Sequence, residues 1–209
     1  RTQELLYFIR IIKEKGLVKN HADFPVVVDS PLAVEATNIY STELYDYYDE
    51  EAIELLRSGV NPVTFPDLKL SVSSDESKAI NDDLTPKVII SASGMCEAGR
   101  IRHHLKHNLW RPECTVLFVG YQSQGTVGAK LLDGAPAVKL FGEEIQVKAE
   151  IARIDSFSSH ADEPHLLEWI KKTNVSTRIF INHGEDQVTE SFAAEAAKAT
   201  GKEAVAPYS

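Results

Sequence analysis

The sequence predicts an α/β protein with a mainly parallel sheet flanked by helices. Three stretches share one order, in which an apolar strand runs into a small polar loop and then into a helix. They begin at Pro25, Lys87 and Thr115. Because this alternation returns each strand to the same sheet with a helix over its face, it favours parallel pairing.

The first predicted element is a helix from Thr2 to Lys15, which Gly16 ends. Its apolar side chains recur at helical spacing: Leu5, Phe8, Ile9 and Ile12. A buried strand follows from Pro25 to Asp29. Ser30 and Pro31 come next, and they are typical of a helix N-cap and of the first helical position.

The middle of the chain repeats this order twice. We expect a strand at 87–90 followed by a helix over 97–109, and a strand at 115–119 followed by a helix that ends at Leu132. Residues 67–83 are rich in Ser and Asp and show little periodicity. This composition predicts an irregular connection.

The pattern changes after Pro136. Residues 138–140 and 144–151 alternate in the way that antiparallel strands do, so we place a domain boundary near Gly142, between 1–142 and 143–209. The elements expected beyond it are helices at 163–172 and 189–200 and strands at 178–182 and 203–206.

Composition narrows the class of protein. The 209 residues can hold one large or two small domains, and 43% apolar with 25% charged residues is usual for a soluble globular chain. No apolar run is long enough to span a membrane, and no secretory signal is present. Cys96 and Cys114 form no disulfide framework, which favours a reducing compartment and a cytoplasmic location. The opening at Arg1 is typical of the inside of a longer protein, so we treat the chain as a fragment.

Charge is unevenly distributed. The net charge of −9 argues against indiscriminate nucleic-acid binding, yet residues 87–111 carry five Lys or Arg and three His against one acid. The cations are Lys87, Arg100, Arg102, Lys106 and Arg111. A local basic stretch on an acidic protein favours a polyanion bound at one place, although a solvated helix face is the commoner meaning of such a run.

Small polar loops follow the predicted strands. Ser91, Ser93 and Gly94 offer two hydroxyls and a glycine at the carboxyl edge of the sheet, where ligands of parallel sheets bind. Taken alone, they are a weak signal and are more typical of a turn than of a phosphate contact. Asp29 ends a strand at the same edge, but an Asp before Ser-Pro is also common at a helix start.

Two histidines lie in polar loops beside a predicted helix and a predicted strand. His160 lies in Phe157-Ser-Ser-His-Ala-Asp162, and His183 lies in Asn182-His-Gly-Glu185. A loop histidine held by such elements suits a metal ligand or a proton donor, although a lone histidine is more often an ordinary surface or core residue. A hydrolytic zinc normally needs three protein ligands, and the chain holds no His-x-His-x-Asp-His run, P-loop or Gly-x-Ser-x-Gly elbow.

Four motifs, in this order, make the chain resemble the beta-CASP family of RNA-processing nucleases with a metallo-beta-lactamase fold. They are Gly94-x-x-x-x-Gly99-Arg100-x-x-His103-His104-Leu105, Phe118-Val-Gly-Tyr-Gln122 with Gly125-Thr126, and the two histidine motifs. The family includes relatives of RNase J and of the endonuclease of pre-mRNA 3′-end processing. The likeness covers nearly the whole chain.

The resemblance implies a beta-CASP domain over 1–142, inserted into a metallo-beta-lactamase αββα fold whose C-terminal part is 143–209. The active site would lie in the cleft between the two domains, with two zinc ions in the full-length protein. His183 matches the last zinc ligand and His160 the general acid of hydrolysis, with Asp162 as its candidate orienting partner. The residues expected to contact the phosphate or single-stranded RNA are Ser91, Ser93, Gly94, Ser159, Arg100, Arg102 and Lys106.

Because most zinc ligands of the family are not in this sequence, we expect the fragment alone neither to hold both ions nor to cleave RNA. One alternative is a non-catalytic RNA-binding or scaffold subunit of an RNA-processing complex. Another is an unrelated α/β module that binds a small phosphorylated ligand. A homodimer is compatible with each of them, and membrane binding is not expected.

Overall fold

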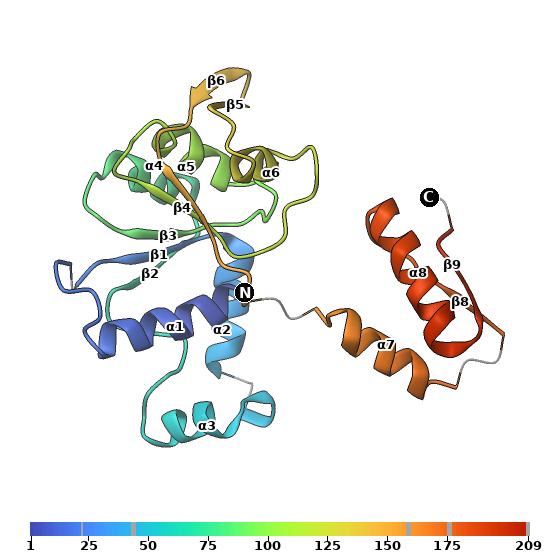
Figure 1. Ribbon diagram of the computed structural model, residues 1–209. Helices are drawn as coiled ribbons and strands as arrows, with labels where there is room; N and C mark the ends of the chain where they lie inside the picture. The colour runs from blue at the N-terminus through green and yellow to red at the C-terminus, as the bar shows by residue number, and fades with distance from the viewer. Residues whose placement is uncertain (22, 43–44, 158–159, 175–176, 208–209) are drawn as a thin grey trace. The chain divides into compact units, whose positions relative to one another are not determined.

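Figure 1 shows the computed structural model of the chain, which describes residues 1–21, 23–42, 45–157, 160–174 and 177–207. The chain divides into two compact units, Arg1–Phe157 and Ser158–Ser209. The predicted α/β class with mainly parallel strands is confirmed in both. The domain boundary expected near Gly142 stays a prediction.

The first unit is built on a parallel three-stranded sheet. Strand β1 (Val26–Asp29) lies between β2 (Leu68–Ser71) and β3 (Val88–Ile90), and it pairs in parallel with both. All four residues of β1 are buried, because a central strand covered on both faces exposes neither side. A core cluster joins β1 to the helices through Leu6 and Val34.

The helices that accompany this sheet include one, at Pro31–Thr42, that contacts β1 and β2 (Figure 1). They are α1 (Thr2–Glu14), α2 (Pro31–Thr42), α3 (Glu50–Arg57) and α4 (Ser74–Asp82), with a short 3-10 helix at Tyr45–Tyr47. The acidic residues at the start of α3 follow Asp49, whose side chain accepts a hydrogen bond from the Ala52 N–H. Negative charge at a helix N-terminus is stabilised by the helix dipole.

The rest of the first unit surrounds a second apolar cluster. Its elements are α5 (Ile101–Asn108), β4 (Thr115–Phe118), α6 (Val127–Leu132), β5 (Ala137–Leu140), β6 (Glu143–Gln146) and β7 (Glu150–Arg153). Leu105, Leu109, Phe118, Leu131 and Leu140 pack in its centre. Strands β5 and β6 form an antiparallel hairpin, whereas β4 and β7 pair in parallel.

Several expectations about single elements are wrong. Residues 67–83 are not irregular, because they form β2 and α4. Ser73 caps α4 in a reciprocal capping box with Glu76, a signal that the Ser- and Asp-rich composition concealed. Residues 144–151 are antiparallel only as far as Gln146, since β7 pairs in parallel with β4. The helix expected over 97–109 begins at Ile101, after Gly99 with φ of +73°.

The second unit holds α7 (Glu163–Lys172), β8 (Arg178–Phe180), α8 (Asp186–Thr200) and β9 (Glu203–Val205). Strands β8 and β9 pair in parallel, with α8 as the connection between them. Ile170, Ile179 and Ala196 form its apolar core. Helix α8 begins three residues before the expected start, and β8 is shorter than expected. No helix in the described part of the chain is long and apolar enough to cross a bilayer.

Candidate functional site

Three parallel strands bring polar residues to one edge of the first unit's sheet. Asp29 ends β1, Ser71 ends β2, and Ser91 directly follows β3. Because β1 is parallel to both neighbours, the carboxyl ends of the three strands meet at this edge. The loop that the sequence predicts to contact phosphate therefore starts at the edge where parallel sheets bind ligands.

Asp29 is the centre of a buried hydrogen-bond network at this edge. Its side chain has no exposed area, and Oδ1 accepts a hydrogen bond from Arg100 Nη1 at 2.7 Å. Oδ2 accepts one from Ser77 Oγ at 2.6 Å and lies 2.7 Å from His104 Nε2. His104 Nδ1 lies 2.8 Å from the side chain of Asn81. The network therefore joins β1 to α4 and α5.

The charge state of this network follows from burial and hydrogen bonding. Burial by itself would raise the pKa of Asp29, but hydrogen bonds from Ser77, Ser71, His104 and Arg100 outweigh it and hold that pKa below its ordinary value. Burial lowers the pKa of His104, and this effect exceeds the opposite influence of Asp29. The buried pair is therefore an Asp29 carboxylate and an Arg100 guanidinium, with a neutral His104 donating from Nε2.

The loop after β3 is held in place by its own hydrogen bonds. Ser91 Oγ donates to the carbonyl oxygen of the last β1 residue at 3.0 Å, and Gln122 Nε2 donates to Gly94 O at 2.7 Å. Gly99 has φ of +73°, and a Cβ there would lie 2.7 Å from Ala92 O. This close approach requires glycine at position 99 and folds the loop back toward the sheet.

The predicted phosphate-contacting residues differ in their surroundings. Ser93 is half-buried in this loop and Gly94 is exposed, whereas Ser159 lies outside the described residues. The guanidinium of Arg100 donates to the buried carboxylate of β1 and to the carbonyls of Ser71 and Val72. We infer that Arg100 stabilises the sheet edge. Its role as an RNA contact stays a prediction.

The other two predicted RNA contacts, Arg102 and Lys106, lie one turn apart on α5. Lys106 Nζ donates to Glu143 Oε1 at 2.6 Å, so its charge is compensated. The guanidinium carbon of Arg102 lies 4.4 Å from the centre of the Phe141 ring. The two cations of this face therefore differ: Lys106 pairs with a carboxylate, whereas Arg102 packs against an aromatic ring.

Both predicted active-site histidines belong to the second unit. His160 is exposed just before α7, and His183 is exposed in the loop between β8 and α8 with φ of +64°. Asp162, considered as a partner of His160, caps α7 by accepting a hydrogen bond from the His165 N–H at 3.0 Å. Its Oδ1 also lies 2.6 Å from His165 Nδ1. A role for Asp162 beside His160 stays a prediction.

The described residues offer few side chains that could bind zinc together. An exposed imidazole such as that of His183 is a common zinc ligand. Among the described residues, however, no group of three or more His, Cys, Asp or Glu side chains could hold a metal ion. A zinc site that used His183 would therefore need its other ligands from outside the described residues.

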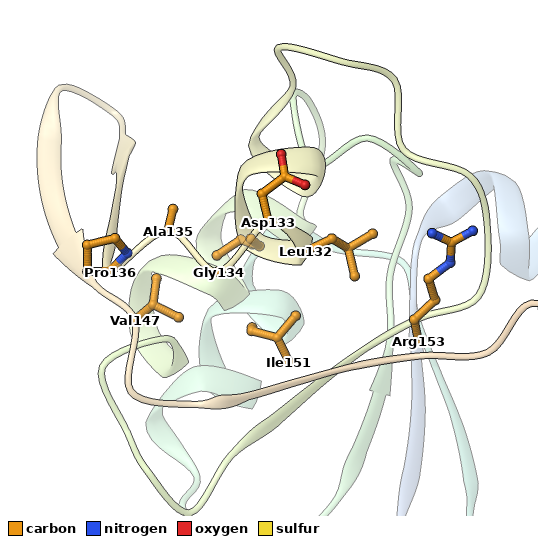
Figure 2. Close-up of a pocket in the computed structure, with 9 residues that line it drawn as sticks. Leu132, Asp133, Gly134, Ala135, Pro136, Val147, Ile151 and Arg153 are labelled. Atoms are coloured by element: carbon orange, nitrogen blue, oxygen red, sulfur yellow. The ribbon is translucent and has the colours of Figure 1, made fainter. Parts of the chain in front are cut away.

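A pocket of about 570 Å³ lies at the end of α6 (Figure 2). Leu132 and Asp133 line one part of it, while Val147, Ile151 and Arg153 belong to the segment that leads through β7. Arg153 pairs with a neighbouring carboxylate, that of residue 155. Of the predicted site residues that the structure describes in the first unit, none lines this pocket.

Comparison with known families shows to which family the chain belongs. Residues 2–131 match the Beta-Casp domain, which is more than half of the chain. The chain belongs to the beta-CASP family. Residues 144–207 of this beta-CASP chain match a second domain, described as the Zn-dependent metallo-hydrolase RNA specificity domain. His160 and His183 lie within that second match.

The curated relatives of the chain include ribonucleases and transcription termination factors. The beta-CASP chain is 36% identical over 187 residues to Ribonuclease TTHA0252 of Thermus thermophilus, which covers 90% of this chain and 41% of the relative. It is 30% identical to an RNase J-like protein of Methanocaldococcus jannaschii, over 92% of this chain and 42% of the relative. It is 28% identical to Transcription termination factor FttA of Methanosarcina mazei, over 95% and 31%. The chain thus spans about two-fifths or less of these relatives.

Sequence reasoning missed the network around Asp29 in this beta-CASP chain. It placed His104 and Arg100 in a basic stretch and gave Asp29 equal weight as a helix-start residue and as a site residue, without connecting the three. Arg100 and His104 lie 71 and 75 positions from Asp29, so no local spacing connects them. The available signal was an acid at the end of a buried strand, which needs a partner when it is buried.

Proposed function

We propose that the protein is a zinc-dependent ribonuclease that hydrolyses RNA phosphodiester bonds. One observation carries the proposal: His160 and His183 are both exposed in loops that lead into helices, within the segment that matches the Zn-dependent metallo-hydrolase RNA specificity domain. The names of the relatives support an RNA substrate and, for Ribonuclease TTHA0252, a nuclease activity.

The two histidines have different roles in this proposal. His183 offers an imidazole nitrogen as one ligand, and zinc, when bound, would supply a Lewis acid and an activated water for attack on phosphorus. His160 donates a proton to the departing 3′ oxygen, and general acid catalysis of this kind contributes roughly 10²–10⁴ in rate. The remaining zinc ligands would come from outside the described residues.

Single substitutions in the full-length protein test these roles. We expect His183→Ala to lower the zinc content, because it removes a ligand. We expect His160→Ala to slow single-turnover cleavage by roughly 10²–10⁴ with zinc retained, because only the proton donor is lost. Zinc would be measured by atomic emission on dialysed protein, and cleavage on a labelled single-stranded RNA.

His165→Ala is the matched control, since His165 is exposed in the same unit and contacts Asp162, the residue that caps α7. It should change zinc content and cleavage little. Equal zinc loss in the His160 and His183 variants would contradict the proton-donor role. Full activity in both variants would contradict the roles of the two histidines, and no cleavage by the full-length wild type would contradict the ribonuclease itself.

A second candidate is RNA recognition without cleavage in transcription termination or RNA processing, since other relatives are named transcription termination factors and not ribonucleases. In that case the RNA-binding surface of the first unit would matter and the two histidines would not. Cleavage of the labelled RNA by the full-length wild type, and its loss in the His160 variant, therefore separate the candidates. A cytoplasmic location and a homodimer stay predictions.

A further inference from the structure

The tip of the β5–β6 hairpin holds an aromatic residue in an unfavourable backbone conformation. Leu140 pairs with Glu143, so Phe141 and Gly142 alone form the turn, and their φ angles are +51° and +84°. Tight hairpin turns with two positive φ angles normally place Asn, Asp or Gly first. A bulky side chain in that position is strained, and such residues cluster at functional sites.

Burial in the core does not offset this strain, because the Phe141 ring stays at the surface. The residue is 43% exposed, and its ring packs against the first turn of α5. Its centroid lies 4.5 Å from that of the exposed His103 ring, at an interplanar angle of 33°. The guanidinium carbon of Arg102 lies 4.4 Å from the same centroid. These three side chains, Arg102, His103 and Phe141, are called the Phe141 platform.

Arg102 supplies a charge that its neighbours do not compensate. Four cations of the basic stretch pair with carboxylates: Lys87 with Asp83, Arg100 with Asp29, Lys106 with Glu143 and Arg111 with Glu113. Arg102 makes no ion pair or hydrogen bond with any residue that the structure describes, and its buried Nε has no hydrogen-bond partner there. A guanidinium in this state is suited to a phosphate oxygen, which accepts charge-assisted hydrogen bonds.

Negative charge near the Phe141 platform is already neutralised. Glu143 follows the turn directly, and its Oε1 lies 2.6 Å from Lys106 Nζ. The ion pair reduces the repulsion that Glu143 would exert on an incoming polyanion. The platform therefore offers exposed aromatic rings beside one uncompensated cation.

We propose that the Phe141 platform binds one nucleotide of a single-stranded nucleic acid. A base stacks on the exposed aromatic surface of His103 and Phe141, and the adjoining phosphate pairs with Arg102. Stacking of this kind uses the π-face of a base and not its hydrogen-bonding edge, so it tolerates any base. It is stronger for purines, because their ring system is larger. This inference rests on the proposed action on RNA, and it adds a contact that neither histidine of the second unit provides.

A substitution suited to the turn tests the stacking. Phe141→Asn removes the ring and places a residue that tight hairpin turns prefer, so the fold should be kept. We expect its affinity for an adenosine 15-mer to fall roughly 5- to 100-fold, the range for loss of one base–aromatic contact. Phe141→Trp should retain the affinity of the wild type. Affinities would be measured by fluorescence anisotropy, with circular dichroism to verify folding.

Inorganic polyphosphate of matched charge serves as a polyanion without bases. Its affinity should change less than about twofold in Phe141→Asn, because Arg102 remains. Equal losses for polyphosphate and the adenosine 15-mer would show that the ring only positions Arg102, which overturns the stacking. Unchanged 15-mer affinity in Phe141→Asn, or no binding of the 15-mer by the wild type, would also overturn it. In each case the proposed ribonuclease is judged separately, by the His160 and His183 variants.

Discussion

At the scale of single residues, the decisive feature is a buried charge and its partners. Asp29 stays ionised because Arg100 and three neutral hydrogen-bond donors compensate its burial. His104 stays neutral because burial disfavours its charged form. Breaking a buried pair of this kind is strongly destabilising, so these residues stabilise the sheet edge from which the Ser91 loop starts.

We expect the free energy of unfolding to fall as the pH falls below about 6.5, the ordinary pKa of histidine. The folded pKa of His104 is lowered, so in this range the unfolded chain binds a proton that the folded unit does not. The loss should approach about 1.4 kcal/mol per pH unit at most and end at the folded pKa. Urea unfolding at several pH values measures it.

Two variants isolate the contribution of His104. His104→Gln should be less stable but should show a flatter pH profile between pH 7 and 5. His107→Gln is the matched control, since His107 is exposed on the same helix, and it should leave the profile unchanged. A wild-type stability that does not fall in this range, or that rises, would contradict a neutral buried His104.

At the scale of elements, α5 carries two functions on different faces. Its buried side chains, His104 and Leu105, belong to the Asp29 network and to the apolar core. Arg102 and Lys106 lie four residues apart on another face, as the helical period requires. The sequence predicted a basic stretch over 87–111, but the pairing of Lys106 with Glu143 depends on the neighbouring hairpin.

The two cations of α5 should therefore contribute unequally to RNA binding. We expect Arg102→Ala to weaken binding of single-stranded RNA and to reduce the slope of log affinity against log salt by about 0.7, the value for one phosphate contact on a single strand. Lys106→Ala should change the slope by less than half as much, because Lys106 already pairs with Glu143. Titrations at several salt concentrations measure both quantities.

Glu143→Gln provides the complementary variant. It frees Lys106, so binding should become tighter and the slope steeper than in the wild type. Identical slope losses for the Arg102 and Lys106 variants would show that RNA opens the Lys106–Glu143 pair. No change in any variant would leave α5 a solvated helix face.

At the scale of the whole molecule, the site residues are divided between two compact units. The Asp29 network and the Phe141 platform belong to the first unit, whereas His160 and His183 belong to the second. The chain spans 41% of Ribonuclease TTHA0252, and its described residues hold no group of three metal-ligating side chains. Metal binding and cleavage therefore depend on the full-length protein in our proposal.

We expect the purified 209-residue chain neither to retain two zinc ions nor to cleave single-stranded RNA, because a hydrolytic zinc normally needs three protein ligands. Zinc would be measured after dialysis against a weak chelator, with the full-length protein as the positive control. Stoichiometric zinc or clear cleavage by the chain alone would contradict the proposed division of ligands.

The sequence by itself determined the α/β class, most strands and helices, and the beta-CASP family. These follow from local apolar periodicity, from capping residues such as Ser30 and Pro31, and from short motifs, all of which act over a few neighbouring residues. It failed at α4, where a capping box lay within polar residues, and at β7, because strand alternation does not specify which partner is paired.

Only the tertiary structure decided which polar residues meet. Arg100 and His104 reach Asp29 because parallel pairing brings strand ends to one edge, and the cost of burying an unpaired carboxylate selects these partners. In the same way, the fold pairs Lys106 with Glu143 and sets Phe141 against Arg102. Contacts between residues this far apart in sequence depend on chain topology, and no periodicity or motif records them.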